Sequence, residues 1–281
     1  MTSRQSLPCR RVGEFSIVTL SGGSLPIGMD SLANIDADVA FDLQSQADDI
    51  APVSIHLNAY LVRGQGRNVL IDSGLDHQQL VGSLAELGVT PAAVDTVLLT
   101  HAHPDHVGGL LDEAGAAAFP NAELVLDQRE FEFWQDDGPF ARALGRSRTN
   151  FLIARRAFAG YAGRVRTVSA GAVLPGIQAV DLAGHTVGHT GYRLESAGQS
   201  LLVWGDVVHF PGVQVACPEA TVRFDQDPSR AVATRRRIFD QVSDEGILVA
   251  GMHLGQPGFV RIRRAGDRYQ LLGDGVEVPS T

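Results

Sequence analysis

The chain has 281 residues, of which 44% are hydrophobic and 20% are charged, as is typical of a globular protein with a sizeable core. Its net charge of −9 disfavours binding to the phosphate backbone of nucleic acids, and its two cysteines are too few for a disulfide framework. No run approaches about 18 apolar residues and residues 1–11 lack the apolar core of a secretory signal, so we expect a cytoplasmic protein without a membrane span.

The first half of the chain is predicted to form strands separated by turns. Residues 1–12 are polar and are expected to be flexible. Residues 14–20 alternate like a strand, which the pair Gly22-Gly23 is expected to end. Residues 24–54 show no clear period and are expected to cover the site, contact a partner subunit or form a solvated loop. A helix is predicted over residues 78–87, and strands over residues 56–63, 67–72, 96–99 and 123–126.

The densest group of reactive side chains follows the predicted strand at 96–99. It reads Thr-His-Ala-His-Pro-Asp-His-Val-Gly-Gly and holds three of the nine histidines. Alternate residues of an extended chain point the same way, so His101 and His103 share a side. The proline after them ends the extended run, which lets Asp105 and His106 point elsewhere. One segment can therefore supply two adjacent metal positions, because imidazole and carboxylate are zinc ligands. A solvated polar loop is the disfavoured alternative.

The second half repeats this plan of strands and helices. A helix is predicted to start over residues 128–134, and another spans residues 141–161. Six arginines in or just after these helices are expected to form a solvated face: Arg142, Arg146, Arg148, Arg155, Arg156 and Arg164. A second sheet is predicted from strands at residues 165–168, 177–182, 192–195 and 201–204. The chain then shows a helix capped by Asp227, a strand at 247–250 and a hairpin over 259–272.

Five motifs together resemble the metallo-β-lactamase superfamily of αββα hydrolases. Besides the histidine segment, they are Leu70-Ile71-Asp72-Ser73-Gly74, Gly184-His185-Thr186-Val187-Gly188-His189-Thr190, Trp204-Gly205-Asp206 and Gly251-Met252-His253-Leu254. Within the superfamily, the chain is most similar to the branch that contains methyl parathion hydrolase and the dinuclear-zinc N-acyl-homoserine lactonases. The resemblance implies an α/β (α+β) fold, an αββα sandwich of two mixed β-sheets with helices on the outer faces, as a single domain over residues 1–281.

The resemblance also implies two Zn²⁺ per chain. His101, His103 and His185 would bind one ion. Asp105, His106 and His253 would bind the other, and Asp206 would bridge the two. In support, His185, Asp206 and His253 each follow an apolar predicted strand, where α/β sheets place their sites.

Three further residues belong to this expected site. Asp72 and His189 would support the ligands from behind, although Asp72 could instead cap the turn that follows it. His209 stands where many homoserine lactonases have a tyrosine that touches the substrate carbonyl. It could donate a hydrogen bond there or protonate a leaving group, or it could be a plain surface histidine.

The activity that the resemblance implies is cleavage of a lactone or carboxylic (aryl) ester by a metal-bridging hydroxide, which Asp105 or Asp206 would orient. Phosphotriester hydrolysis, as a side or main activity, and a non-catalytic metal-binding protein are the alternatives. Phe131, Trp134 and Phe210 are predicted to line the substrate pocket, although such aromatic residues are more often core. The expected partners are a small-molecule ester or lactone and a second copy of the chain in a homodimer, with no nucleic acid and no membrane.

Overall fold

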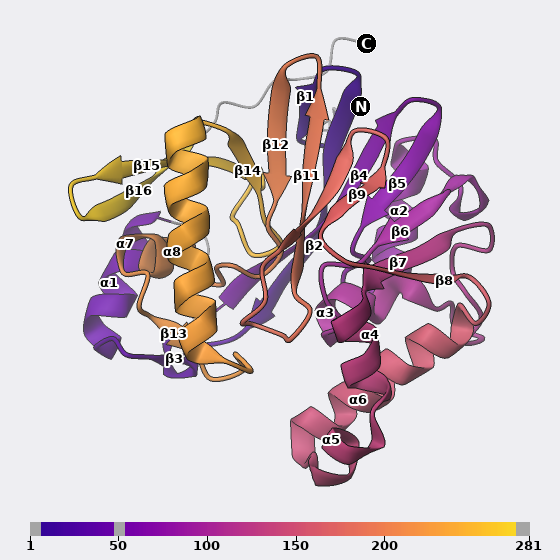
Figure 1. The fold of residues 1–281 in the computed structure, drawn as a ribbon, viewed down its shortest axis with the longest axis horizontal. Helices are drawn as coiled ribbons and strands as arrows, with labels where there is room; N and C mark the ends of the chain where they lie inside the picture. Colours follow the sequence, from indigo (N-terminus) through magenta and orange to yellow (C-terminus); the bar gives the residue numbers. More distant parts are fainter. Residues whose placement is uncertain (1–6, 48–53, 274–281) are drawn as a thin grey trace, which may run out of the picture.

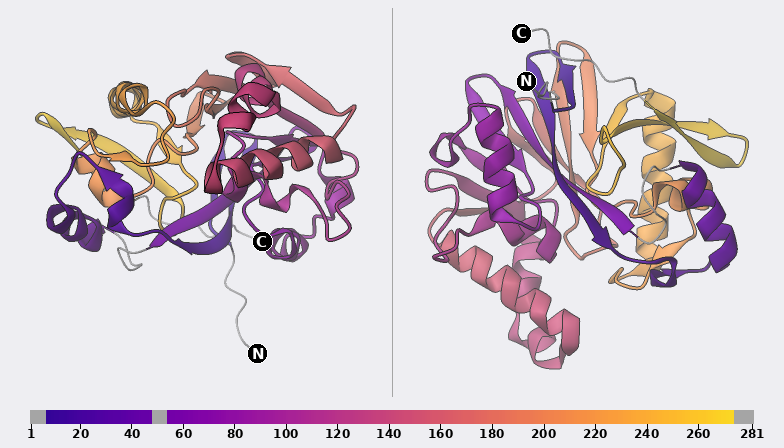
Figure 2. Two further views of the ribbon diagram at one scale, coloured as in Figure 1. Left: turned by 90° about the horizontal axis from the view of Figure 1, so that it is seen from below. Right: turned by 180° about the vertical axis from the view of Figure 1, so that it is seen from behind.

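The computed structural model describes residues 7–47 and 54–273, which form two seven-stranded sheets packed face to face. Helices cover the outer faces of both sheets (Figures 1 and 2). Side chains from both sheets, including Tyr60, Leu98, Tyr192 and Val203, form a buried apolar layer between them. The predicted αββα sandwich is therefore confirmed. Among the described residues, no helix is long and apolar enough to cross a membrane.

The first sheet is built from the first half of the chain and has the strand order β1-β2-β4-β5-β6-β7-β8. Its strands are β1 (Cys9–Val12), β2 (Phe15–Pro26), β4 (Ser54–Gly64), β5 (Arg67–Ile71), β6 (Thr96–Leu98), β7 (Glu123–Asp127) and β8 (Val165–Val168). The strands from β5 to β8 are parallel. The interior strands β5, β6 and β7 are mostly buried, as expected of parallel strands covered on both faces, whereas the edge strand β8 has no buried residue. The prediction that residues 165–168 belong to the second sheet is wrong, because β8 pairs with β7.

The second sheet has the order β16-β15-β14-β12-β11-β10-β9. Its strands are β9 (Gly171–Leu174), β10 (Ile177–Asp181), β11 (Thr190–Ser196), β12 (Gln199–Val203), β14 (Leu248–Ala250), β15 (Phe259–Ala265) and β16 (Arg268–Gly273). β12 and β14 are parallel neighbours, and β15 and β16 form the predicted hairpin. A small third sheet pairs β3 (Leu32–Ala33) with β13 (Thr221–Val222).

Helices pack on the sheets through apolar side chains. On the first sheet lie α2 (His77–Glu86), α3 (Pro104–Val107), α4 (Gln128–Gln135) and α6 (Gly145–Gly160), with short turns η2 (Pro91–Ala93) and η3 (Gly108–Leu110). The short helix α5 (Asp137–Arg142) projects beyond the sheet and packs on α6 through Phe140 and Phe151. The second sheet is covered by α8 (Pro228–Glu245), whose Ile238 and Phe239 face Leu202 and Val249. Asp227 caps α8 as predicted, since its carboxylate accepts the Arg230 N–H at 3.0 Å.

The predictions for the N-terminal region need correction. Residues 9–12 form β1 and pair with β2, whereas residues 1–6 lie outside the described part. The glycine pair does not end β2, because an irregularity between Ser21 and Ser24 absorbs it and pairing continues to Pro26. Residues 24–54 hold η1 (Met29–Ser31), β3 and α1 (Ala37–Ala47), which packs on α7 (Pro211–Ala216), and residues 48–53 are not described.

The predicted helix over 141–161 is interrupted, because α5 ends at Arg142 and α6 begins at Gly145. Its arginines do not all face solvent. The Arg155 guanidinium donates to the carbonyl of Trp134 and pairs with Asp137. The solvated-face prediction is therefore wrong for Arg155, which ties α6 to α4 and α5.

Candidate metal centre

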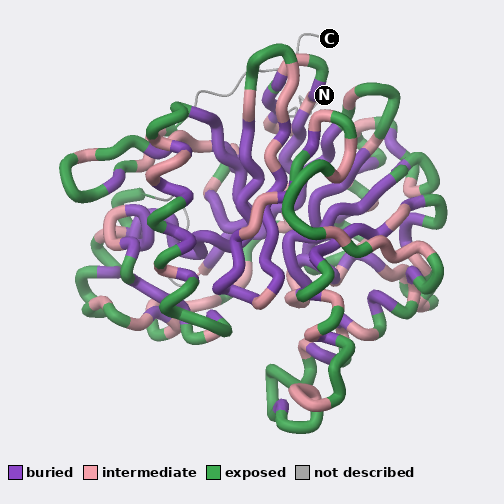
Figure 3. Tube along the Cα trace, in the orientation of Figure 1, coloured by how far each residue is buried: buried purple, intermediate pink, exposed green. Residues whose placement is uncertain are grey.

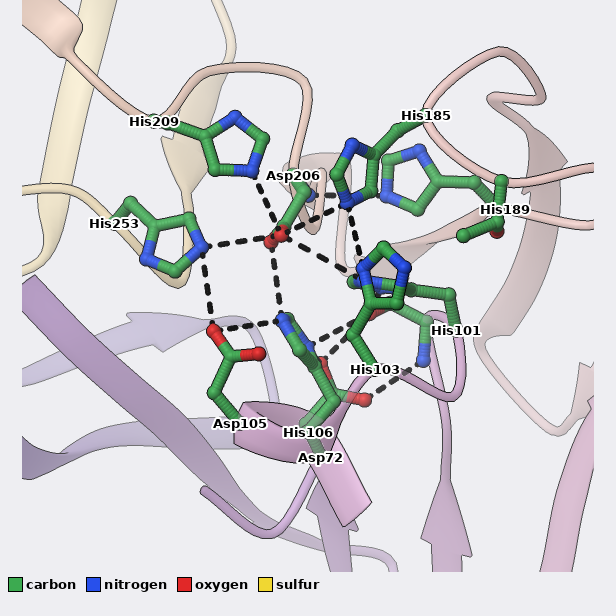
Figure 4. A network of polar contacts seen from close by, with 12 residues as sticks. Asp72, His101, His103, Asp105, His106, His185, His189, Asp206, His209 and His253 are labelled. Carbon is green, nitrogen blue, oxygen red and sulfur yellow. Dashed lines mark hydrogen bonds and ion pairs between the residues drawn. The ribbon is translucent and has the colours of Figure 1, made fainter. Parts of the chain in front are cut away.

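The candidate ligands gather where strands of both sheets end (Figure 4). In the first sheet, the histidine segment leaves β6 and begins α3. In the second sheet, Asp206 follows β12, His253 follows β14, and His185 lies in the loop between β10 and β11. Parallel strands point their carboxyl ends to the same edge of a sheet. The fold thus brings together side chains that lie up to 152 positions apart, from His101 to His253.

A first group consists of three histidines. The His103 Nδ1 atom lies 3.0 Å from Nε2 of His101 and 3.0 Å from Nε2 of His185. His101 and His185 are buried, and burial lowers the pKa of both His101 and His103 well below the usual range. Neutral imidazoles facing one another at this distance have the form of a metal site with three nitrogen ligands.

A second group forms around the buried carboxylate of Asp206. One of its oxygens lies 3.1 Å from His253 Nε2 and 3.4 Å from His185 Nε2, and the other lies 3.3 Å from His106 Nε2. Asp105 approaches the same nitrogens of His106 and His253 at 3.6 and 3.7 Å. Asp206 therefore contacts histidines of both groups, which is the position expected of a carboxylate shared by two ions.

The outward nitrogens of these histidines are held by other groups. The His106 Nδ1 atom lies 2.6 Å from a carboxylate oxygen of Asp72, and His185 Nδ1 lies 2.8 Å from Asp225. His253 Nδ1 lies 2.7 Å from the carbonyl oxygen of His56. Each of these outward nitrogens faces an acceptor and can hold a proton there, so in a metal centre the inward nitrogen would present a lone pair. Burial alone would lower the pKa of His106 and of His253, but the nearby Asp206 carboxylate raises both.

Two buried atoms at the centre make no hydrogen bond although they lie 3.3 Å apart, which tests whether the residues fit a metal. His106 Nε2 and Asp206 Oδ1 form no hydrogen bond within the described structure. Burial alone would raise the pKa of Asp206, but the surrounding histidines hold it well below the usual range. Buried polar atoms are seldom left without a hydrogen bond, and here a ring nitrogen and an anionic oxygen face the same space. The residues present fit a cation.

Asp72 is fully buried and has a left-handed backbone, with φ of 58°. Its carboxylate accepts the Thr100 N–H and hydroxyl, each at 2.7 Å, in addition to contacting His106. These contacts fix the start of the histidine segment, and within the described residues the Asp72 side chain makes no hydrogen bond to the turn after it. The alternative that Asp72 caps that turn is therefore wrong. Such a backbone is tolerated by aspartate when its surroundings fix it.

His189 uses both ring nitrogens for the backbone. Its Nδ1 donates to the Leu182 carbonyl at 3.1 Å, and its Nε2 accepts the Asp206 N–H at 3.0 Å. Burial lowers the pKa of His189 to about 3, so the ring is neutral near pH 7. In this arrangement His189 positions the main chain of Asp206 and has no nitrogen left for a metal.

His209 lies at the site and is 2% exposed, so the surface-histidine alternative is wrong. Its Nε2 is 3.1 Å from Asp206, and its ring stacks on that of His253 with centroids 4.8 Å apart. Burial lowers the pKa of His209 to about 4. The neutral ring can donate one hydrogen bond. Its position also groups it with His185 and Asp206 as a possible ligand set.

A pocket of about 390 Å³ opens above the candidate ligands, with the buried histidines and Asp206 at its floor. Its apolar walls come from Leu25, Ile27, Ile55, Phe133, Trp134, Phe151 and Phe224. Trp134 was predicted there and meets the ring of His103 edge-on at 5.8 Å. The predictions for Phe131 and Phe210 are wrong. Phe131 packs on Phe158 behind the wall, and Phe210 is fully buried in the apolar cluster under α1 and α7.

Sequence reasoning missed Glu130, a fully buried carboxylate on α4. It accepts four hydrogen bonds: from the Ala102 and Gly188 N–H groups at 3.0 Å each, and from the Trp134 indole and the Thr186 hydroxyl at 2.7 Å each. Glu130 therefore joins the loop of His101 and His103, the loop of His185 and a pocket wall. A single glutamate in an amphipathic helix carries no sequence signal for that role.

Comparison with known proteins agrees with this arrangement. The family model described as Metallo-beta-lactamase superfamily matches residues 56–244. A curated relative, the beta-lactamase-like protein 2 homolog of Drosophila melanogaster, is 38% identical over 84 residues. That alignment covers 29% of this chain and 27% of the relative, so the chain spans about a quarter of the relative's length.

Two solved structures match nearly the whole chain. The hydrolase AbOPH of the beta lactamase superfamily is 31% identical, with a TM-score of 0.89 over 98% of this chain and 100% of that one. The dizinc quorum-quenching lactonase AidC has the same TM-score of 0.89 over 97% of this chain and 99% of its own. Its identity of 20% is evidence of the shared fold alone.

Proposed function

The chain belongs to the metallo-β-lactamase superfamily and is a metal-dependent hydrolase, and from this premise we propose that it uses two zinc ions to cleave a lactone or a carboxylic ester. The observation that carries the proposal is the shared position of Asp206 between His101, His103 and His185 on one side and Asp105, His106 and His253 on the other.

Bound ions would lower the pKa of a shared water towards neutrality and polarise the carbonyl of the substrate. The protein groups have separate tasks around that chemistry. Asp105, whose side chain is 17% exposed, lines the pocket and can accept a proton from water. His209 is neutral near pH 7, and its one N–H toward the site is at Nε2, 3.1 Å from Asp206 Oδ2. If bound ions engage the Asp206 oxygens, this N–H can donate instead to the carbonyl or leaving oxygen. Trp134 and Phe224 can pack on an acyl chain or aryl ring.

The apolar walls favour an ester or lactone with an uncharged reacting end. The same residues at the pocket floor could direct a water molecule at phosphorus. Phosphotriester hydrolysis, with the same metal ligands, is therefore the second candidate function. A non-catalytic metal-binding protein is the third. The pocket disfavours this third candidate, because it opens directly onto the proposed ligands and leaves room for a small molecule.

The deciding experiment combines metal analysis with a substrate panel. We expect two zinc ions per chain by elemental analysis. The zinc-loaded protein is then assayed with acyl-homoserine lactones, simple lactones, aryl esters and methyl paraoxon, and a lactone or aryl ester should be turned over fastest. Phosphotriester turnover alone would favour the second candidate. Zinc binding without turnover of any substrate would favour the third.

Replacing His209 by alanine should lower kcat by roughly a hundredfold, because a positioned donor near the reacting oxygen is lost. The zinc content should stay the same, because all seven histidines and aspartates of the proposed set remain. Steady-state kinetics on the best substrate and elemental analysis of the same sample measure both effects. An unchanged kcat would exclude this role. A loss of zinc would instead make His209 a ligand.

We also propose that the chain forms a homodimer, as expected from the resemblance. Light scattering at micromolar concentration should then give a mass near twice the 30.0 kDa of one chain. A mass near 30.0 kDa would reject the homodimer.

A further inference from the structure

Two arginines stand at the rim of the pocket, on opposite halves of the chain. Arg146 lies in the first turn of α6, and Arg223 directly follows β13. Both side chains are exposed, whereas the floor of the pocket is buried. The region of α5 and the start of α6 projects from the body of the molecule and is largely exposed (Figures 1 and 3). The pocket therefore has a cationic rim above an apolar wall.

Neither rim arginine has an anionic partner in the described structure. No ion pair or hydrogen bond of the Arg146 or Arg223 guanidinium is formed within residues 7–47 and 54–273. Some arginines of this chain, such as Arg155 and Arg193, are paired with carboxylates, whereas in the described part of the chain Arg63 on the exposed side of β4 is not. What distinguishes Arg146 and Arg223 is that both lie at one pocket, where within the described residues their positive charge is not neutralised.

The carboxylates of the pocket are already engaged. Three of them line it: Asp105, Asp206 and Asp225. All three lie against histidines of the floor, with Asp225 at 2.8 Å from His185. They are ligands or partners of ligands in the proposed centre, so they do not neutralise the rim.

We propose that the substrate is an ester or lactone that carries a carboxylate, which Arg146 and Arg223 bind while the reacting carbonyl lies at the floor. This inference rests on the proposed function. Guanidinium groups present paired N–H donors that match the two oxygens of a carboxylate. Gln226 adds a further donor at the rim, since its amide oxygen accepts the Val187 N–H at 3.0 Å and leaves its NH₂ group to the pocket. The apolar walls would hold the chain between the two ends.

A matched pair of substrates tests the proposal. One is the mono-4-nitrophenyl ester of adipic acid, which keeps a free carboxylate. The other is the same compound with that carboxylate methylated. Release of 4-nitrophenol gives kcat/KM for each. The zinc-loaded wild type is compared with the double variant Arg146→Gln/Arg223→Gln and with Arg63→Gln, an exposed arginine of β4 outside the pocket.

We expect the wild type to prefer the anionic ester by about tenfold, mainly through KM, and the preference to weaken in high salt. In the double variant the ratio of the two kcat/KM values should fall to about one, whereas Arg63→Gln should keep it. A wild type without preference, or a double variant with the wild-type ratio, would overturn the proposal while leaving the hydrolase function intact.

A binding measurement separates this proposal from the proposed function. Calorimetric titration of the zinc-loaded protein with monomethyl adipate and with dimethyl adipate should give binding of the anion only, and the double variant should lose it. If neither nitrophenyl ester is cleaved but this binding pattern holds, ester hydrolysis is wrong and anion recognition stands. If the anion binds equally well to the double variant, the carboxylate binds elsewhere and the proposal is overturned.

Discussion

Replacing Asp206 by asparagine should abolish activity, with kcat/KM lower by at least about a hundredfold, and should strip metal from the protein. The Asp206 carboxylate lies within 3.6 Å of five histidine rings: His101, His106, His185, His209 and His253. In the proposed centre its charge would hold two cations close together, and an amide of the same shape would supply a weaker ligand without that charge. Both ions of the proposed pair should therefore be affected, unlike in a variant of any one histidine.

The measurement is the metal content of purified protein by elemental analysis, followed by kinetics at saturating zinc. Asp267→Asn is a suitable control, because that carboxylate is exposed in the turn between β15 and β16. The control should retain both zinc ions and full activity. A variant of Asp206 that still holds two ions would show that the carboxylate does not bridge them.

The candidate ligands could be located from sequence because each is local to a strand end. The three histidines and the aspartate of the histidine segment occupy six positions, and Asp206 and His253 each follow a short apolar run. The structure places all of these side chains within reach of one another. Strand ends and turns are determined largely by the local sequence. The place of such a site along the chain is therefore predictable, even though its three-dimensional geometry is not.

The supporting contacts could not be predicted because they are not local. Asp225 meets His185 across 40 positions, and Glu130 meets Gly188 across 58. The prediction of the residues that line the pocket wall was partly wrong for a related reason. Phe131 and Phe133 lie on one short helix, and only packing against α6 decides that Phe133 faces the pocket. The sheet to which β8 belongs is likewise decided by its pairing with β7, and no feature of its own four residues indicates it.

Glu130 is the place where a conservative change should cost the most stability. Each of its two carboxylate oxygens accepts two donors, so all four acceptor positions are used. Glutamine has one acceptor oxygen, and in either orientation of its amide two buried donors would face an NH₂ group. Burial raises the pKa of Glu130, and the four donors oppose that shift by favouring the ionised form. The native arrangement thus depends on a carboxylate at this position.

Glu130→Gln should lower the free energy of unfolding by about 3 kcal/mol, because two buried donors lose their acceptor. The melting temperature should fall by about 5–10 °C. Since Glu130 holds the loops of His103 and His185, zinc affinity measured by chelator competition well below that temperature should fall by about tenfold or more. Glu132→Gln on the exposed side of α4 is the matched control and should leave both quantities unchanged. Lower stability with unaltered zinc affinity would mean that Glu130 supports the fold without positioning the metal ligands.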